Sequence, residues 1–149
     1  MDASSPPKII LDLAPSLGPA GFRLVDAGEL YTLLSSILGI VSGLVGAGTT
    51  GAASTALRPG VSVYTPSAGN TGVQLPPGLP GQEITVVNAS GTVAGVLYGN
   101  VGTGDQIVPL ASATGAASLA MAAGTTAFLV CTGKNMSTGV ATWKVIALG

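Results

Sequence analysis

The chain has 149 residues, enough for one domain and its attachments, and only 7% of them are charged, for a formal net charge of −1. Its hydrophobic fraction of 47% excludes intrinsic disorder, which needs low hydrophobicity and high net charge. Its five Lys and Arg residues are scattered, so the basic cluster that binds nucleic acid is not expected. The 23 glycines and 10 prolines instead predict many short strands joined by tight turns.

The N-terminal segment, residues 1–25, combines helix-breaking prolines with apolar side chains. Prolines at this density favour extended backbone, so we predict an apolar arm that lies in a groove on a neighbouring protein. Its expected contact residues are Ile9, Ile10, Leu11, Leu13, Phe22 and Leu24. The acidic, proline-broken start does not resemble a secretory signal, and synthesis in a cytoplasm is expected.

Residues 26–46 are predicted to form a helix. Asp26 and Glu29 have the spacing of a capping box, in which each side chain bonds to the other residue's backbone N–H. Apolar residues then repeat every three or four positions, as in the seam of a coiled coil. A helix of this length is only marginally stable by itself, and the pattern therefore predicts a homo-oligomer. Three copies are favoured over two because the apolar surface is wider than a two-helix seam needs. The seam consists of Leu30, Leu34, Ile37, Val41 and Leu44.

A membrane-spanning helix is the competing interpretation of residues 30–48. The stretch is uncharged and approaches the roughly 20 residues that cross a bilayer. It lacks flanking Lys or Arg residues and an interfacial Trp, and Thr and Ser dilute its hydrophobicity. Packing against protein is therefore the preferred interpretation.

Residues 47–59 are rich in Gly, Ala and Thr and are predicted to be a linker. Residues 60–149 then alternate β-type runs with turn signals. The expected strands are 61–65, 72–75, 83–88, 94–98, 106–109, 117–121, 126–132 and 141–148. About eight short strands predict an all-β domain, a jelly-roll-like sandwich or barrel.

The residues offer no catalytic, cofactor or metal site. Without histidine there is no Ser-His-Asp triad and no imidazole ligand. Cys131 lies in an apolar run and is predicted to be a small buried hydrophobe. Glu83 and Asp105 fall on separate elements and are interpreted as solvated charges rather than as a carboxylate pair. We therefore expect a protein that is not an enzyme and that needs no cofactor.

Two further features favour structure over ligand binding. The glycine-rich stretch from Gly99 to Gly104 lacks the lysine of a phosphate-binding loop and is interpreted as a turn. Trp143 shares a strand face with Val145 and is predicted to lie in the core. A sugar site built on Tyr98, Asn100 and Asp105 is a weaker alternative.

Several segments of the β-domain together resemble a known group of proteins. They are residues 72–88 (GVQLPPGLPGQEITVVN), 96–98 (VLY), 104–107 (GDQI), 122–131 (AAGTTAFLVC) and 142–144 (TWK). In this order they resemble small tailed-bacteriophage virion proteins of the capsid decoration, cement or head-fibre type. The resemblance implies a trimeric, jelly-roll-like knob on the virion surface and carries no functional residues over to this chain.

The expected function is therefore that of a capsid cement or decoration protein in the virion, which binds the major capsid protein and stabilises the assembled head. A head- or tail-fibre tip that binds host glycans is one alternative. A membrane-active protein that uses residues 30–48 is another.

Overall fold

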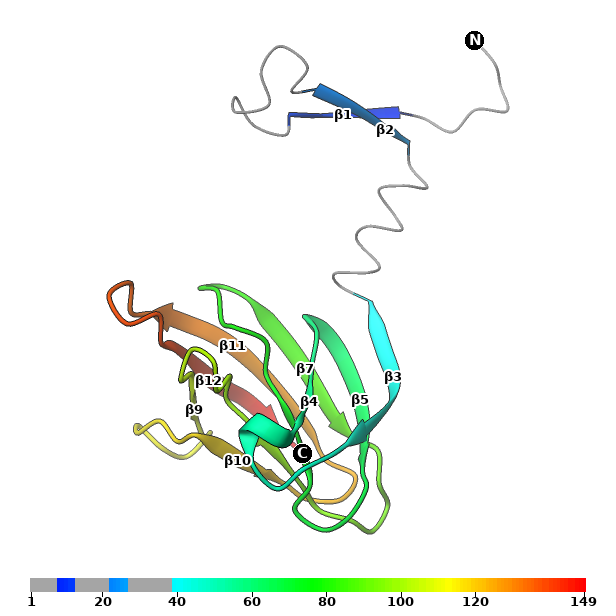
Figure 1. The fold of residues 1–149 in the computed structure, drawn as a ribbon, viewed down its shortest axis with the longest axis vertical. Helices are drawn as coiled ribbons and strands as arrows, with labels where there is room; N and C mark the ends of the chain where they lie inside the picture. Colours follow the sequence, from blue (N-terminus) through cyan, green and yellow to red (C-terminus); the bar gives the residue numbers. More distant parts are fainter. Residues whose placement is uncertain (1–7, 13–21, 27–38) are drawn as a thin grey trace. The chain divides into compact units, whose positions relative to one another are not determined.

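The computed structural model describes residues 8–12, 22–26 and 39–149, and the chain divides into two units, Met1–Gly39 and Ile40–Gly149. In the first unit, strands β1 (Lys8–Asp12) and β2 (Phe22–Asp26) pair antiparallel, with Ile10 opposite Leu24 (Figure 1). The extended backbone agrees with the prediction. The two segments nevertheless pair with each other, so they do not form one continuous arm.

The second unit is a sandwich of two β-sheets (Figure 1). The six-stranded sheet contains, in spatial order, β3 (Ile40–Gly46), β5 (Gly60–Pro66), β7 (Glu83–Asn88), β11 (Thr126–Lys134), β12 (Ala141–Leu148) and β9 (Gln106–Val108). The four-stranded sheet contains β10 (Ser118–Met121), β8 (Gly95–Tyr98), β6 (Gly72–Gln74) and β4 (Thr55–Ala56). A short 3₁₀ turn, η2 (Gly51–Ala53), precedes β4. The predicted all-β sandwich is confirmed.

From β3 to β10, each successive strand lies in the opposite sheet from the one before it. Alternate strands are therefore parallel neighbours: β3, β5 and β7 in one sheet, and β4, β6 and β8 in the other. Antiparallel pairing enters with β10 against β8 and with β11 against both β7 and β12. The pairing is thus mixed, whereas a jelly roll is antiparallel.

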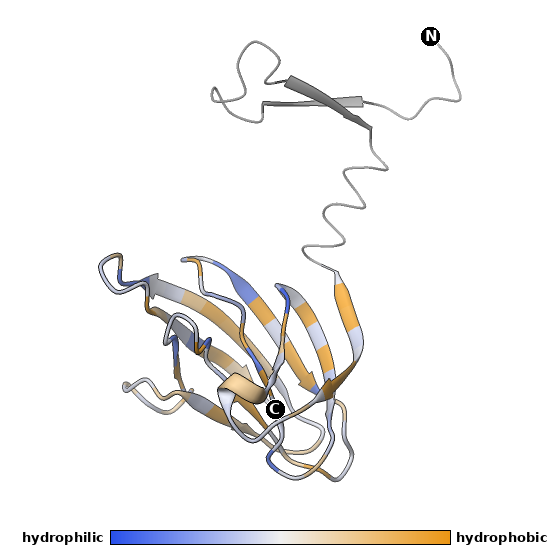
Figure 2. Cartoon of the chain, in the orientation of Figure 1, coloured by the Kyte–Doolittle hydropathy of each residue, from blue (hydrophilic) through white to orange (hydrophobic). Residues whose placement is uncertain are grey.

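The core lies between the sheets and follows from the two-residue period of the strands. On β7, Ile84 and Val86 are buried while Thr85 and Val87 are half-buried on the opposite face. The same alternation runs along β11 and β12, and apolar positions recur along the strands in Figure 2. The side chains buried without exposure include Tyr64, Val73, Leu75, Val86, Leu97, Ile107, Met121, Leu129, Cys131, Trp143 and Val145.

The predicted helix is wrong for its C-terminal part, because residues 40–46 form strand β3. Of the predicted seam residues, Val41 pairs with Ser62, and Leu44 pairs with Tyr64 and packs against the core. Gly43 has a φ of +74° within a register shift between Val41 and Leu44, and this backbone conformation suits glycine. Glycine disfavours helix, and the β-branched residues Ile40, Val41 and Val45 favour strand.

The predicted linker over residues 47–59 is also wrong. Leu57 is buried in the core, and its backbone N–H donates to the Gln74 carbonyl at 2.8 Å. Thr55 and Ala56 form β4 and pair parallel with β6. A Cβ on Gly51 would overlap the Val101 side chain, so the small residues of this segment permit close packing. The sandwich therefore begins at Ile40 instead of at residue 60.

Asp26, the predicted cap of this helix, is instead the last residue of strand β2. Residues 27–38 of the predicted helix, which include Leu30, Leu34 and Ile37, lie outside the described residues, as does Leu13. Within the described part of the chain, no helix has the length and hydropathy needed to cross a membrane. The proposed span over residues 30–48 is contradicted where it includes β3.

Candidate functional site

The Asp105 carboxylate is buried and accepts four hydrogen bonds. The backbone N–H of Gly78 donates to Oδ2 at 2.8 Å, and that of Ala141 donates to Oδ1 at 2.9 Å. The Thr103 hydroxyl donates to Oδ1 at 2.6 Å, and the Trp143 indole N–H donates to Oδ2 at 3.3 Å. A buried carboxylate is tolerated only when hydrogen bonds replace its hydration. Asp105 therefore connects the 76–81 turn, the 99–105 loop and the start of β12.

This arrangement corrects the interpretation of Asp105 as a solvated charge, because only 3% of the residue is exposed. Its carboxylate oxygens are occupied by protein donors, which leaves no geometry for general acid or base work. Glu83 lies on the other side of the sheet, because its neighbour Ile84 faces the core while Glu83 itself is exposed. The two carboxylates do not form a pair.

The glycine-rich loop is a turn, as predicted. The Asn100 side chain organises it: Oδ1 accepts from the Thr103 backbone N–H at 3.1 Å, and Nδ2 donates to the Leu75 carbonyl at 3.1 Å. The Asp105 backbone N–H donates to the Asn100 carbonyl at 2.9 Å. These bonds bring the Asp105 carboxylate to its partners.

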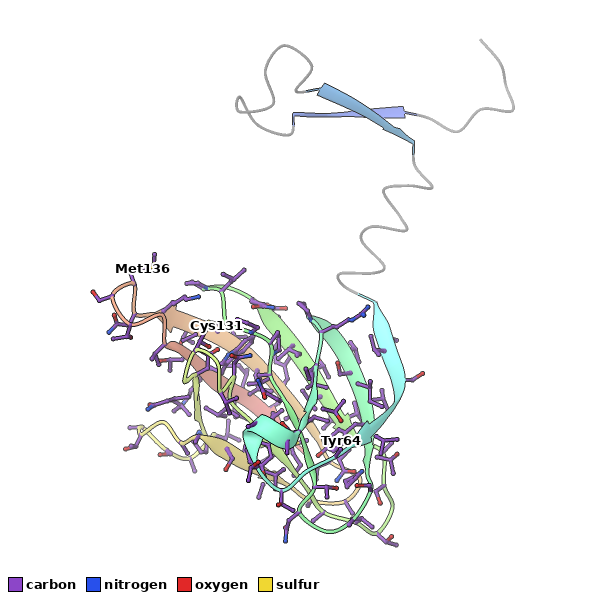
Figure 3. All side chains as sticks on the ribbon, viewed as in Figure 1. Tyr64, Cys131 and Met136 are labelled. Carbon is purple, nitrogen blue, oxygen red and sulfur yellow. The ribbon has the colours of Figure 1, made fainter. Side chains whose placement is uncertain are left out.

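Cys131 is buried between the sheets, so the prediction of a buried hydrophobe is confirmed (Figure 3). Burial raises the pKa of its thiol, and the nearby Asp105 carboxylate raises it further. Both effects disfavour the thiolate, which is the reactive form. Cys131 is therefore poorly suited to act as a nucleophile.

Trp143 is also buried, so the prediction of a core residue is confirmed. A fully covered indole cannot serve as a stacking platform for a sugar. Tyr98 is only half-buried, but it packs closely over Gly51 and Gly72. The aromatic residues of the weaker glycan hypothesis are thus used in packing.

Asn88, at the end of β7, is a second buried polar centre, and it was not among the predicted site residues. Its Nδ2 donates to the carbonyls of Val93 and Ala122, both at 3.0 Å, and its Oδ1 accepts from the Ser90 backbone N–H at 3.1 Å. The Asn88-Ala89-Ser90-Gly91 turn signal could have identified it, because Asn commonly organises turns in this way. Its role is structural.

The feature that suits contact with another protein is the outer face of the six-stranded sheet. We define this outer face by six side chains that alternate with core residues: Ile40, Val61, Val63, Val87, Phe128 and Val130. Strand pairing joins Ile40, Val61, Thr85, Phe128 and Ala147 in one row across five strands. A sheet face turned to water normally carries polar residues. The sequence contains these residues, but only the pairing register shows that they adjoin.

The predicted capsid-contact residues Ile9, Ile10 and Leu11 lie on β1, and Phe22 and Leu24 lie on β2. Pairing sets Ile10 opposite Leu24 and brings these two groups of residues together. The predicted seam is not brought together among the described residues, since Val41 and Leu44 belong to the sandwich.

In the described ranges, no three His, Cys, Asp or Glu side chains are grouped as metal ligands. Comparisons of the chain with protein-family models, with curated proteins and with solved structures found no match.

Proposed function

We propose that the protein is a structural virion protein that binds the major capsid protein and stabilises the assembled bacteriophage head. The observation that carries this proposal is how few charges the sandwich presents. Between Ile40 and Gly149 the charged residues are Arg58, Glu83, Asp105, Lys134 and Lys144, and Asp105 is buried. A surface so poor in charge suits close packing beside other subunits, whereas free soluble domains carry many charges of both signs.

The absence of an evident reactive centre in the described residues agrees with this function. The buried carboxylate and the buried thiol are both enclosed by the fold. The resemblance of residues 72–144 to virion proteins points in the same direction. The proposed mechanism is thermodynamic: a protein that binds only the assembled shell stabilises that shell by mass action.

The contact with the shell is assigned to the N-terminal segment, whose strands β1 and β2 contain Ile9, Ile10, Leu11, Phe22 and Leu24. Because β1 and β2 pair with each other, the backbone groups on their facing edges are already hydrogen-bonded. The two strands can therefore place apolar side chains in a groove without leaving those groups unsatisfied. Leu13 belongs to the same proposed contact.

Co-sedimentation with empty shells of the encoding virus tests this function. The full chain is expected to pellet with the shells and to raise the temperature at which they disrupt. A variant without residues 1–25 should retain the β-type circular dichroism of the sandwich, which is a compact unit by itself, but should stay in the supernatant. If the full chain does not bind shells, the proposed function is wrong. If the truncated protein binds undiminished, only the assignment to the N-terminal segment is wrong.

A further inference from the structure

We propose that the outer face of the six-stranded sheet packs against the same face of a second copy of this chain, about a two-fold axis that runs along β11. This contact does not depend on the proposed function. It also differs from the predicted seam, whose described members lie on β3.

The side chains of the outer face are incompletely covered in the single chain. Val61, Val63, Val87, Phe128 and Val130 are half-buried, and Ile40 is 72% exposed at the edge of the sheet. Val63 pairs with Val87, so a second apolar row adjoins the row that contains Phe128. β-Sheets pack face to face by interdigitating such side chains, with their strands nearly aligned. The outer face therefore matches the inner surface of a sheet-on-sheet interface.

The charges that flank this face select a second copy as the occupant. Glu83 on β7 and Lys144 on β12 lie on opposite sides of Val130 in one row of paired residues. A two-fold axis along β11 exchanges the two sides of that strand, so it places β7 of one copy over β12 of the other. Glu83 on β7 of each copy then lies over β12 of the other copy, which carries Lys144. The dimer therefore brings together two pairs of opposite charges, each formed by Glu83 of one copy and Lys144 of the other.

The Lys144 ammonium also donates to the Ser112 carbonyl at 3.1 Å, which ties this charge to the loop between β9 and β10. The flanking charges therefore fix the orientation of the two copies, while the apolar rows supply the contact area. Five strands spaced about 4.8 Å apart, with three rows of side chains, give a footprint of roughly 500 Å². Stable dimers bury about 800 Å² per partner, so this pairing is expected to be reversible and concentration-dependent.

Cross-linking of single cysteines in the full chain by a short bis-maleimide tests the position of the axis. Residues on β11 lie on the axis and meet their own counterparts across the roughly 10 Å that separates packed sheets. A direct disulfide cannot span that distance, so Thr126→Cys is expected to give a covalent dimer with a bis-maleimide of about 10 Å span. Val63 lies on the same face but two strands away, so two copies of Val63→Cys would be about 19 Å apart and should not react. Cys131 is buried and does not compete.

Val96→Cys is the matched control on the other sheet, because Val96 is likewise half-buried at an outward position of β8. Cross-linking by Thr126→Cys alone supports the proposal. The proposal is overturned if Thr126→Cys stays monomeric, if Val96→Cys cross-links equally well, or if only Val63→Cys cross-links, because that result would place the axis elsewhere.

A second measurement keeps the test independent of cross-linking chemistry. Val87→Lys puts a charge in the apolar row, and sedimentation equilibrium of the full chain should show association weakened at least tenfold. Val96→Lys is the control and should associate like the unmodified protein, with circular dichroism confirming that both variants fold. A full chain that sediments as a monomer at every concentration, or Val87→Lys without effect, would refute the contact. Either result would instead point to another protein, or to another part of the same chain, as the partner that covers this face.

Discussion

At the scale of single residues, Asp105 is the side chain on which most of the loop structure depends. Its carboxylate satisfies two backbone N–H groups, a hydroxyl and an indole, which come from segments far apart in the sequence. The Thr103 hydroxyl also lies 3.1 Å from Asn100 Oδ1, but its bond to Asp105 is the shorter one at 2.6 Å. A single charge thus stabilises the junction of two loops with the last strand.

Asp105→Asn is expected to lower the free energy of unfolding by about 2–4 kcal/mol, because it removes the charge and turns an NH₂ group toward N–H donors. Urea unfolding followed by Trp143 fluorescence measures the change. Glu83→Gln, which alters an exposed carboxylate, should change stability by no more than about 0.5 kcal/mol. Equal stability of Asp105→Asn and the parent would show that the hydrogen bonds to this carboxylate contribute little.

Tyr64 gives a prediction about alkaline pH. Its hydroxyl is buried without a hydrogen-bond partner in the described structure, and burial raises its pKa to about 12, whereas the ordinary value is about 10. The unfolded chain therefore ionises Tyr64 at lower pH than the folded chain does. The resulting stability is fully present below about pH 10 and is lost as the pH rises toward 12, by at most about 2–3 kcal/mol.

Tyr64→Phe should remove this part of the pH dependence and leave stability near neutral pH unchanged or slightly higher, since no hydrogen bond is lost. Urea midpoints at about pH 9 and about pH 11.5 measure the effect in both proteins. The Cys131 thiol, whose pKa burial also raises, is common to both proteins and cancels in the comparison. If the two proteins lose equal stability between these pH values, the raised pKa of Tyr64 is not the cause.

At the scale of elements, the sequence predicted the strands from residue 60 onward and missed those before it. All eight expected strands form, and β7 and β12 have the expected bounds, because alternating residues and Gly/Pro turns are local signals. Strand β3 was missed because Leu30, Leu34, Ile37, Val41 and Leu44 fit a helical spacing. Its competing signal was Gly39, Gly43 and Gly46 among β-branched residues.

The candidate site was less accessible to sequence reasoning than the fold. That Cys131 and Trp143 are buried could be predicted from their apolar neighbours. The hydrogen-bonding role of Asp105 could not, because its donors at Gly78 and Ala141 are 27 and 36 residues away along the chain. The outer face likewise depends on parallel pairing between strands in non-adjacent parts of the sequence, which no local pattern encodes.

Close backbone approach between elements gives a further prediction. A Cβ on Gly99, at the end of β8, would overlap the Asp105 carbonyl, and backbone atoms cannot move aside as a flexible side chain can. Gly99→Ala is therefore expected to lower the free energy of unfolding by about 2–4 kcal/mol. Thermal unfolding measures the change.

Gly91→Ala is the matched control, because a Cβ there meets no atom within 4 Å. It should leave stability unchanged or raise it slightly, by restricting the unfolded chain. Indistinguishable melting temperatures for the two alanine variants would mean that the loop after β8 adjusts without cost.

At the scale of the whole molecule, the scarcity of charge predicts how the protein responds to salt. The sandwich carries Arg58, Glu83, Lys134 and Lys144 at its surface, so Coulombic interactions contribute little to its stability. Between low salt and about 1 M NaCl, the melting temperature should shift by no more than about 2 °C. Sodium sulfate should raise it, because sulfate strengthens the burial of apolar groups.

Calorimetry of the full chain in the two salts checks this expectation. Potassium chloride serves as the control for a specific effect of sodium. A melting temperature that rises or falls steeply with sodium chloride would mean that charge interactions, and not apolar burial, dominate the stability of this fold.

The alternation of strands between the two sheets also has a mechanical consequence. Because β3 through β8 cross from one layer to the other at every step, neither layer can be peeled away intact while the other remains. Extending the chain through this stretch would remove strands from the two layers in turn. A domain built in this way is expected to resist tension through both layers together.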